Sequence, residues 1–577
     1  MRLSTRRSRL RSLALLAMLG AFAMSAPGPA ASDDADPARP LLGLTFDHYY
    51  DAAALKAAVE KIHAAFPGWT RLESMGRSRE GRSLWVISVF DPAGRPVEDR
   101  PAMYIDGNTH GNEIQGAETG LFTAKYLLVH RSEPWISALL RRAVIHIAPC
   151  VNPDSRERFL HEPNDEHSPR RVQRPWDDDH DGLVDEDGPN DLDGDGEILE
   201  MRIKDPEGEW VVDERDDRLL RPRKPGEKGQ NRLLGREGID DDGDGQVNED
   251  PPGGVDPNRN WPYEWRPEAG QGGSGPYPLS EPETRATALW VLAHPRIAAV
   301  QSYHNAGSMI LRPPAALTDA EAEMPSDDKA LYDELARRGG ILLPGYRYLQ
   351  IREGLYKVHG GFVDWTYGAL GIFSFTNEVW GLFGWGTSPT DPSALPALQW
   401  NDVALHGEGF VRWHPVKHPT LGEVELGGWR RHTIRSTPLD FLPELCLRNA
   451  MFTLEHAAGM PDVAVTEAEA KEGGARIRVK VENRALLPTI ATWAERHGCL
   501  PADELVVEGT RILAAVEIFR ERDPVAIPIK SGRARLASGI RGTSSRTFDL
   551  FVDPSAGTAT RVTLSSRLGG VVSAPVR

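Results

Sequence analysis

Two parts of the chain alternate helical and strand patterns, and this alternation limits the available folds more than any other sequence feature. Apolar residues recur at helical spacing over residues 51–66, 113–128 and 283–292. Short apolar runs typical of strands cover residues 82–90, 102–106, 143–149, 297–304 and 371–376. Strands and helices in alternation predict an α/β sheet with helices packed against it.

The two α/β parts are separated by residues 158–254, which are charged, rich in Asp and Gly, and poor in apolar periodicity. We interpret this segment as an insertion. After residue 460 the pattern changes to short alternating runs at 475–481, 511–519 and 547–552, which predict a β-sandwich. The predicted organisation is an α/β domain over 41–460 that contains the insertion 158–254, followed by an accessory β-sandwich over 461–577.

Residues 1–31 have the pattern of an export signal peptide. Arginines at positions 2, 6, 7, 9 and 11 precede an apolar run over 13–24, and small residues follow through Ala31. A membrane-spanning helix needs about 20 apolar residues, so this run is too short. We expect cleavage and an exported protein, periplasmic or extracellular, without a membrane span. The Arg6-Arg7 pair leaves the twin-arginine export route open.

The negative formal charge of the chain argues against a nucleic-acid partner. Removal of residues 1–31, which carry five arginines and no acid, changes the formal charge from -17 to -22. Binding to a nucleic-acid backbone depends on clustered Lys and Arg, so we expect no nucleic-acid partner. The three cysteines, Cys150, Cys446 and Cys499, are too few for a disulfide scaffold and too scattered for a cysteine zinc site.

Three metal-binding side chains lie at predicted strand ends. His110 and Glu113 follow the strand at 102–106, and His304 ends the strand at 297–304. Ligands bind beyond the carboxyl ends of strands in open α/β sheets. A catalytic zinc takes three nitrogen or oxygen ligands from the protein and keeps a fourth position for water. Taken alone, His-x-x-Glu is also the ordinary start of a surface helix.

The neighbouring motifs favour the metal interpretation. Eight blocks, at 78–84, 110–113, 152–154, 255–261, 280–283, 304, 356–367 and 375–378, occur in the order found in zinc carboxypeptidases of the carboxypeptidase A type. The chain resembles an exported, bacterial-like member of this family over about residues 45–455, apart from the insertion. The resemblance implies an α/β/α sandwich around a mixed, mostly eight-stranded sheet with one zinc above the strand ends.

The resemblance also implies a role for each matching residue. His110, Glu113 and His304 would bind Zn²⁺, and Glu378 would act as general base, taking a proton from water and returning it to the leaving amine. A capping acid after a strand is the plain alternative for Glu378. An arginine that polarises the scissile carbonyl is expected after residue 154. Arg171 and Arg174 are the candidates, and the alignment favours Arg171 only slightly.

Substrate binding is implied by a second group of residues. Asn258 and Arg259 match the pair that holds the free α-carboxylate, and a planar guanidinium suits that task. Tyr356 matches a mobile tyrosine that closes over substrate, and Val363 matches the position that lines the pocket for the last side chain. A basic side chain would lose its hydration beside Val363 without gaining a partner charge, so we predict apolar C-terminal residues.

The insertion contains three Asp-x-Asp-x-Asp-Gly loops. Oxygen ligands at alternate positions followed by Gly resemble the start of a calcium loop. The twelfth positions lack the Glu of an EF-hand, so the loops look more like the calcium repeats of thrombospondin-type or dockerin-type segments. A solvated acidic face is the alternative to structural Ca²⁺. The candidate ligands are Asp177, Asp179, Asp181, Asp191, Asp193, Asp195, Asp240, Asp242 and Asp244.

The resemblance predicts an exported zinc metallocarboxypeptidase that hydrolyses the C-terminal peptide bond of peptides with a free carboxylate. Three other functions stay open. Two are hydrolases with the same metal triad: a cell-wall γ-D-glutamyl-diaminopimelate carboxypeptidase and an N-acyl amino acid amidohydrolase. The third is a calcium-dependent binding protein with an idle catalytic domain. The sequence indicates neither the natural substrate nor the oligomeric state.

Overall fold

A computed structural model describes residues 41, 43–177, 182–243, 245–248, 250–381, 388, 390–391, 394–519 and 522–577. The predicted signal peptide, residues 1–31, lies outside the described residues. Three of the predicted calcium ligands, Asp179, Asp181 and Asp244, also lie outside them.

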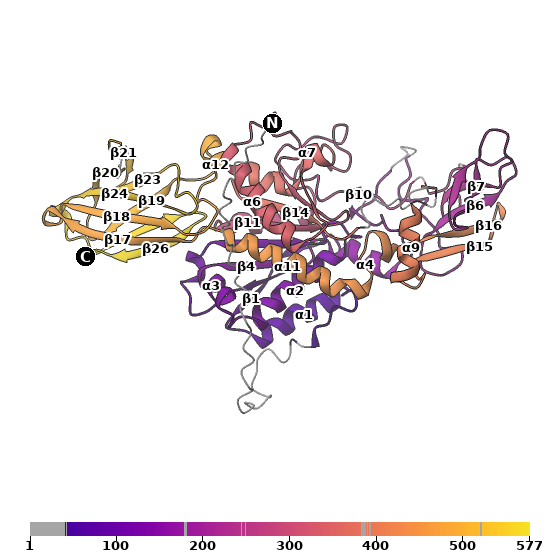
Figure 1. Cartoon of the computed structure of the whole chain (residues 1–577), viewed down its shortest axis with the longest axis horizontal. Helices are drawn as coiled ribbons and strands as arrows, with labels where there is room; N and C mark the ends of the chain where they lie inside the picture. The colour runs from indigo at the N-terminus through magenta and orange to yellow at the C-terminus, as the bar shows by residue number, and fades with distance from the viewer. Residues whose placement is uncertain are drawn as a thin grey trace, which may run out of the picture.

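A mixed eight-stranded sheet forms the centre of the molecule (Figure 1). In spatial order its strands are β1 (Thr70–Arg77), β2 (Ser83–Val89), β4 (Val144–Ala148), β3 (Ala102–Gly107), β11 (Ile297–His304), β14 (Phe373–Glu378), β12 (Met309–Arg312) and β13 (Arg347–Gln350). The inner strands β4, β3, β11 and β14 run parallel to one another. β2 pairs antiparallel with β1 and β4, and β12 pairs antiparallel with β14. The predicted mixed eight-stranded sheet is confirmed.

Helices cover both faces of this sheet. Successive side chains of a strand point to opposite faces, so they contact helices on both sides. Tyr303 of β11 reaches α11, where its hydroxyl lies 2.5 Å from Thr453 Oγ1. Tyr104 of β3 points to the other face and packs against Trp290 of α5 and Phe362 of α8. The main helices are α1 (Ala52–Ala65), α2 (Gln115–Val129), α3 (Pro134–Arg142), α4 (Pro153–His161), α5 (Pro282–Ala293), α6 (Ser326–Leu342), α8 (Phe362–Asp364), η4 (Trp365–Ala369) and α11 (Leu442–Gly459).

A second sheet combines the insertion with a distant hairpin. Its six strands are β15 (Phe410–His418), β16 (Gly422–Trp429), β6 (Glu200–Lys204), β9 (Asn231–Arg236), β7 (Trp210–Val212) and β8 (Leu220–Pro222). Leu426 of β16 pairs with Met201 of β6, and both side chains are buried in a small apolar cluster. The insertion therefore contains more ordered structure than its sequence suggested. We call this six-stranded unit the accessory sheet.

Two five-stranded sheets follow α11 and enclose their own apolar core, so the predicted C-terminal β-sandwich is confirmed. One sheet contains β17 (Val463–Lys471), β18 (Arg476–Asn483), β24 (Ser544–Val552), β20 (Ile512–Ile518) and β21 (Val525–Ile527). The other contains β22 (Ile529–Lys530), β23 (Arg533–Leu536), β19 (Asp503–Glu508), β25 (Arg561–Ser566) and β26 (Gly570–Pro575).

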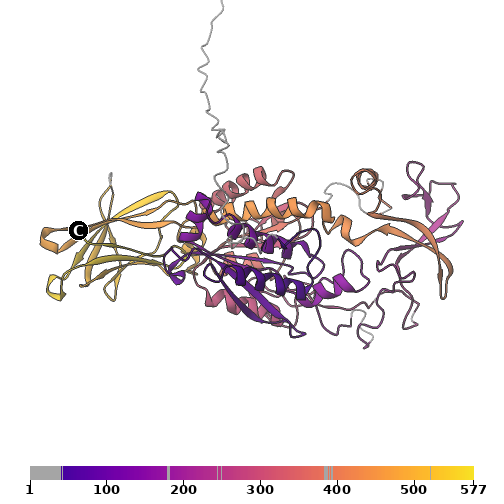
Figure 2. The ribbon, with the colours of Figure 1, turned by 90° about the horizontal axis from the view of Figure 1, so that it is seen from below.

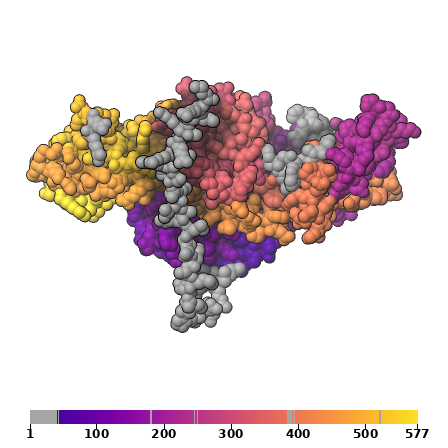
Figure 3. Space-filling view, viewed as in Figure 1, coloured from indigo at the N-terminus to yellow at the C-terminus, as the bar shows by residue number. Residues whose placement is uncertain are grey.

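The sandwich and the accessory sheet lie at opposite ends of an elongated molecule, with the eight-stranded sheet between them (Figures 2 and 3). One part of the C-terminal region packs on the α/β unit instead: α12 (Thr492–His497) contacts α6, and Trp493 stacks obliquely on Tyr367 of η4. Among the described residues, no helix has the length and apolar character needed to cross a bilayer.

Candidate metal centre and substrate cleft

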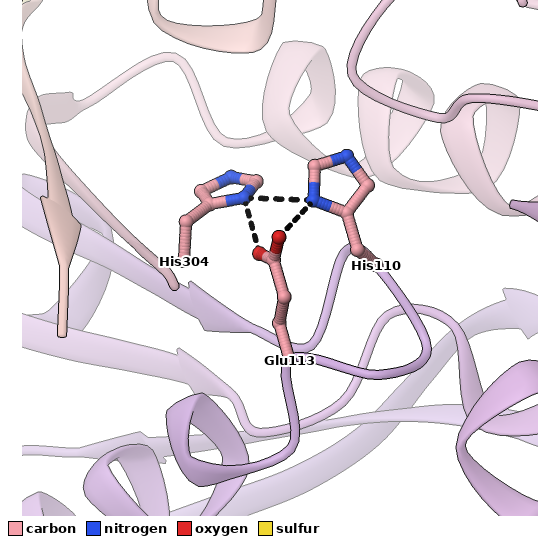
Figure 4. Close-up of side chains that lie close together, drawn as sticks. All are labelled: His110, Glu113 and His304. Carbon is pink, nitrogen blue, oxygen red and sulfur yellow. Dashed lines mark hydrogen bonds and ion pairs between the residues drawn. The ribbon is translucent and has the colours of Figure 1, made fainter. Parts of the chain in front are cut away.

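His110, Glu113 and His304 converge at the carboxyl end of the central sheet (Figure 4). His110 and Glu113 lie in the turn between β3 and α2, and His304 is the last residue of β11. β3 and β11 are adjacent parallel strands, so their carboxyl ends meet at the same edge. The neighbouring-strand arrangement thus brings together side chains that are 191 positions apart in the sequence.

The three side chains present one donor atom each to a common point. Nδ1 of His110 lies 2.9 Å from Glu113 Oε1, and Nδ1 of His304 lies 2.9 Å from Glu113 Oε2. The two Nδ1 atoms are 3.1 Å apart. A tetrahedral zinc about 2.0–2.1 Å from each ligand would separate them by about 3.3–3.4 Å. All three side chains are buried, and the donor set fits zinc with only a slight expansion.

Asp256 supports His110 from behind. Its Oδ1 lies 3.0 Å from His110 Nε2, the ring nitrogen on the side away from Glu113. Such a carboxylate fixes the orientation and tautomer of a metal-binding imidazole. Burial raises the pKa of Asp256, but the charges of Arg259 and His110 outweigh burial and hold that pKa well below its usual range. Asp256 belongs to the 255–261 block, yet sequence reasoning gave it no role.

Arg170, and not the predicted Arg171 or Arg174, lies beside the metal ligands. Its Nη1 donates to Glu113 Oε1 at 2.8 Å, and its Nε donates to Asp256 Oδ2 at 3.2 Å. Arg170 also lines the cleft that contains His110 and His304.

Neither predicted arginine lines this cleft. The backbone carbonyl of Arg171 accepts a hydrogen bond from Ser155, and the Arg174 guanidinium lies 3.4 Å from Glu281. Three arginines within five residues, at positions 170, 171 and 174, could not be distinguished without the fold. Arg170, which was not among the candidates from the sequence, is the arginine of this segment that lines the cleft.

Glu378 is the last residue of β14, next to β11 in the sheet and directly paired in register with His304. It lines the same cleft as the two histidines. Burial, together with the negative charge of Glu113, raises the pKa of Glu378 to about 7. A carboxyl group with such a pKa can both accept and release a proton near neutral pH.

Asn258, Arg259 and Tyr356 meet on another wall of the cleft. The Arg259 guanidinium lies 6.0 Å from the centroid of the Tyr356 ring and donates to the carbonyl of Asn258. Asn258 Oδ1 accepts from the backbone N–H of Phe362 at 2.9 Å, which ties this wall to α8. Arg259 is largely buried, whereas Tyr356 is 55% exposed.

Val363 lies in an apolar pocket that opens beside the metal ligands. Leu311, Ala315, Ile351 and Val358 form one buried cluster with it, and all of these side chains line the cleft. Asp364, the neighbouring acid, points elsewhere: its carboxylate accepts hydrogen bonds from the backbone N–H groups of Ala315 and Ala316. The charged residues that line the cleft are Arg170, Arg259 and Glu378.

Within the described residues, the acids of one Asp-rich loop lie close together. Asp191, Asp193 and Asp195 each place a carboxylate oxygen within 4.8 Å of the other two. Asp191 also accepts hydrogen bonds from the backbone N–H groups of Gly194 and Gly196, which closes the loop. In the other two loops, Asp177 accepts from Gly182 and Asp240 accepts from Gly243.

The comparisons with known proteins point to one family. A model of the zinc carboxypeptidase family matches residues 55–181 and 226–383. Carboxypeptidase D of Mus musculus is 36% identical over 129 residues, which is 20% of this chain and 9% of that protein. Carboxypeptidase E of Caenorhabditis elegans is 35% identical over 150 residues, which is 26% of this chain and 30% of that protein. The aligned regions thus cover less than a third of either relative.

Among solved structures, carboxypeptidase A from Helicoverpa armigera aligns with a TM-score of 0.42 and 17% identity. The alignment covers 63% of this chain and 71% of that one.

Proposed function

Because the chain belongs to the zinc carboxypeptidase family, we propose that it is a zinc-dependent metallocarboxypeptidase that hydrolyses the last peptide bond of peptides. One observation carries the proposal: two buried histidines, the Glu378 carboxylate and the Arg259 guanidinium line a single cleft. This combination offers a metal site, a base and a clamp for a carboxylate within the reach of one substrate.

We propose His110, Glu113 and His304 as the zinc ligands, with Asp256 holding His110 in place. When bound at such a site, zinc acidifies water and polarises a carbonyl group. Glu378 would accept the proton of the attacking water and deliver it to the leaving amine, and its pKa of about 7 suits both transfers.

Arg170 would stabilise the negative charge that develops on the scissile carbonyl oxygen, because its guanidinium lies beside both Glu113 and His110. Asn258 and Arg259 would hold the terminal carboxylate of the substrate, and Tyr356 would close over it. The planar fork of Arg259 matches the two oxygens of a carboxylate.

The apolar surroundings of Val363 support a preference for apolar C-terminal side chains. A Lys or Arg side chain in this pocket would leave water without meeting an opposite charge, which costs free energy. The substrates we propose are therefore peptides with a free carboxylate after a large aliphatic or aromatic residue.

Three further features belong to the proposal. Export to the periplasm or the extracellular space rests on the signal-like residues 1–31. Structural Ca²⁺ rests on the loop of Asp191, Asp193 and Asp195, whose oxygens are of the type calcium prefers. The organisation into a signal peptide, an α/β domain over 41–460 with the insertion 158–254, and an accessory β-domain over 461–577 rests on the composition changes along the chain.

A paired-substrate assay tests the proposed activity. The zinc-loaded protein should release the last residue of a free-acid peptide ending in Phe or Leu, and C-terminal amidation of the same peptide should reduce kcat/KM at least 100-fold. Glu378→Gln keeps the size of the side chain but removes the base, so we expect kcat to fall at least 100-fold with zinc still bound. Equal cleavage of the amidated peptide would reject the carboxypeptidase assignment.

A further inference from the structure

A second cavity lies at the opposite edge of the central sheet from the metal centre. Its lining includes Ala102, Val144 and Ile297, the first residues of the parallel strands β3, β4 and β11. The metal ligands lie at the other ends of β3 and β11. The cavity has a volume of about 360 Å³, and none of its lining residues lines the metal cleft.

Positive charge dominates the lining of this cavity. Arg71, Arg100 and Arg296 contribute three guanidinium groups, and Glu98 is the one acid of the lining. Glu98 lies 3.6 Å from Arg71. Within the described residues, Arg100 and Arg296 have no carboxylate within 4.0 Å, although Arg100 is only 2% exposed. A buried guanidinium ordinarily has an anionic partner, because leaving water without one is costly.

The two unpaired arginines donate to backbone carbonyls instead. Arg100 donates through Nε to Arg95 O and through Nη1 to Leu140 O. Arg296 donates through Nε to Glu98 O and through Nη1 to Ser566 O. A guanidinium has five N–H donors, so these bonds leave donors on each group for another acceptor.

The positive charge continues along the contact between the α/β unit and the C-terminal sandwich. Arg95 donates to Val571 O, Arg142 donates to Met460 O and Ala458 O, and Arg567 donates to Pro295 O. Burial lowers the pKa of all three guanidinium groups, as it does for Arg100 and Arg296.

The carboxylates that act on these five arginines are Asp91, Glu98, Asp99 and Asp462. Asp91 already pairs with Arg141, at 3.1 Å, and Glu98 pairs with Arg71. The region therefore keeps an excess of positive charge on a chain whose formal charge is -17.

His146 adds a neutral polar group to the same cavity. It is 6% exposed, and its Nδ1 lies 2.7 Å from Ser88 Oγ. Burial lowers the pKa of His146 to about 3, so the ring is neutral. When the Ser88 hydroxyl donates to Nδ1, the ring proton is on Nε2 and is available to an acceptor.

We propose that this cavity binds a small oxyanion, either a phosphate or a carboxylate-bearing molecule, at the contact between the α/β unit and the C-terminal sandwich. Arg71, Arg100 and Arg296 would supply charge-assisted hydrogen bonds, and His146 would supply a neutral donor. The anion would balance the guanidinium groups that line the cavity, of which Arg100 is buried. This inference does not depend on the proposed peptidase activity.

Calorimetric titration of the full-length protein, less residues 1–31, tests the proposal. Sodium phosphate and sodium succinate are titrated separately at constant ionic strength set with NaCl, and at least one should bind with a stoichiometry of one. Arg71→Gln and His146→Phe should each raise its Kd about tenfold or more, since each removes a hydrogen bond to an anion. If only one of the two anions binds, its identity shows whether the cavity recognises phosphate or carboxylate.

The matched control is Arg511→Gln, whose exposed side chain pairs with Asp553 on the C-terminal sandwich and lines neither this cavity nor the metal cleft, so it should leave the Kd unchanged. Arg71 is half exposed, so Arg71→Gln should fold even where His146→Phe does not. Failure of both anions to bind would overturn the proposal. It would also be overturned if binding were lost in Arg511→Gln and kept in Arg71→Gln, because the anion would then lie outside this cavity.

Discussion

At the scale of single residues, Arg170 and Arg171 are adjacent in sequence but serve different surroundings. Arg170 contacts Glu113, His110 and Asp256, whereas the backbone carbonyl of Arg171 holds Ser155. Arg170 lines the cleft together with His110 and His304, and Arg171 is not part of that lining. We therefore expect the two arginines to differ sharply in their effect on turnover.

Arg170→Lys tests this difference. Lysine keeps the positive charge but loses the planar fork, so we expect kcat to fall about 100- to 1,000-fold, the usual cost of one oxyanion donor. Arg171→Lys is the matched control and should change kcat less than threefold. Both rates are measured on a free-acid peptide after zinc content is verified. A larger loss in Arg171→Lys would return the role to Arg171.

Val363 gives a second prediction at this scale. The wild-type protein should have a kcat/KM for peptides ending in Phe or Leu at least 100-fold above that for peptides ending in Lys or Arg, because the pocket around Val363 is apolar. Val363→Asp should raise the ratio of kcat/KM for Lys to that for Phe at least tenfold, by supplying a partner charge. A wild-type preference for Lys or Arg would contradict the assignment of this pocket.

At the scale of elements, part of the regular structure was readable from the sequence, whereas β1, α6, α11 and the pairings between distant segments were not. The strands at 102–106 and 297–304 were predicted because they are long apolar runs, and they appear as β3 and β11. β12 and β13 were missed, since four-residue strands give too short a pattern. The accessory sheet was missed because β6 pairs with β16, more than 200 residues away.

The candidate site follows the same division. His110, Glu113, His304 and Glu378 lie at the ends of strands, where a motif fixes both the position and the neighbours of a side chain. Arg170 lies in an irregular segment that leads into the insertion, so only the fold identifies which of several arginines faces the metal ligands. Asp256 was within a recognised block, but its bond to His110 requires the three-dimensional arrangement.

The calcium proposed for the loop of Asp191, Asp193 and Asp195, which precedes β6, is tested at this scale. After removal of divalent ions and reloading with zinc, adding CaCl₂ should raise Tm, and MgCl₂ should do so less, because calcium accepts irregular oxygen geometry whereas magnesium demands a near-ideal octahedron. Calcium at 100 times its Kd would stabilise the protein by about 2.7 kcal/mol. The double change Asp191→Asn and Asp193→Asn should remove the response.

Asp217→Asn is the control for that experiment. Its side chain is 74% exposed, and its described ion pair is with Arg412 of β15, outside the Asp-rich loops. This variant should respond to calcium as the wild type does. Two results would contradict a calcium site: equal stabilisation of the wild type by CaCl₂ and MgCl₂, or an unchanged response in the double variant. The Asp-rich loops would then be a solvated acidic face.

At the scale of the whole molecule, the C-terminal region contributes to the stability of the α/β unit as well as to its own sandwich. Trp493 lies within residues 461–577, yet its indole N–H donates to Gly368 O at 3.0 Å and its ring packs on Tyr367. The Asp328 carboxylate of α6 accepts hydrogen bonds from the backbone N–H groups of Thr492 and Trp493. A boundary at residue 461 would therefore cut through a shared core.

Trp493→Ala tests this coupling. Trp493 is largely buried, so we expect the change to lower the free energy of unfolding by about 3–5 kcal/mol. η4, which carries Tyr367 and Gly368, directly follows α8, which carries Val363 of the cleft. Loosening of η4 should therefore disturb the cleft. We expect the thermal loss of peptidase activity to move to lower temperature together with global unfolding. Activity after heating and calorimetric unfolding are measured on the same samples.

Phe551→Ala provides the comparison, because Phe551 is 37% exposed on the sandwich and should cost less than about 1 kcal/mol. If Trp493→Ala destabilised only the sandwich and left the thermal loss of activity unchanged, residues 461–577 would be energetically separate from the catalytic unit. If Trp493→Ala lowers the temperatures of global unfolding and of activity loss together, the segment around α12 stabilises the substrate cleft. A truncated chain ending at residue 460 would then expose apolar side chains of α6 and η4 and should be less stable than the full chain.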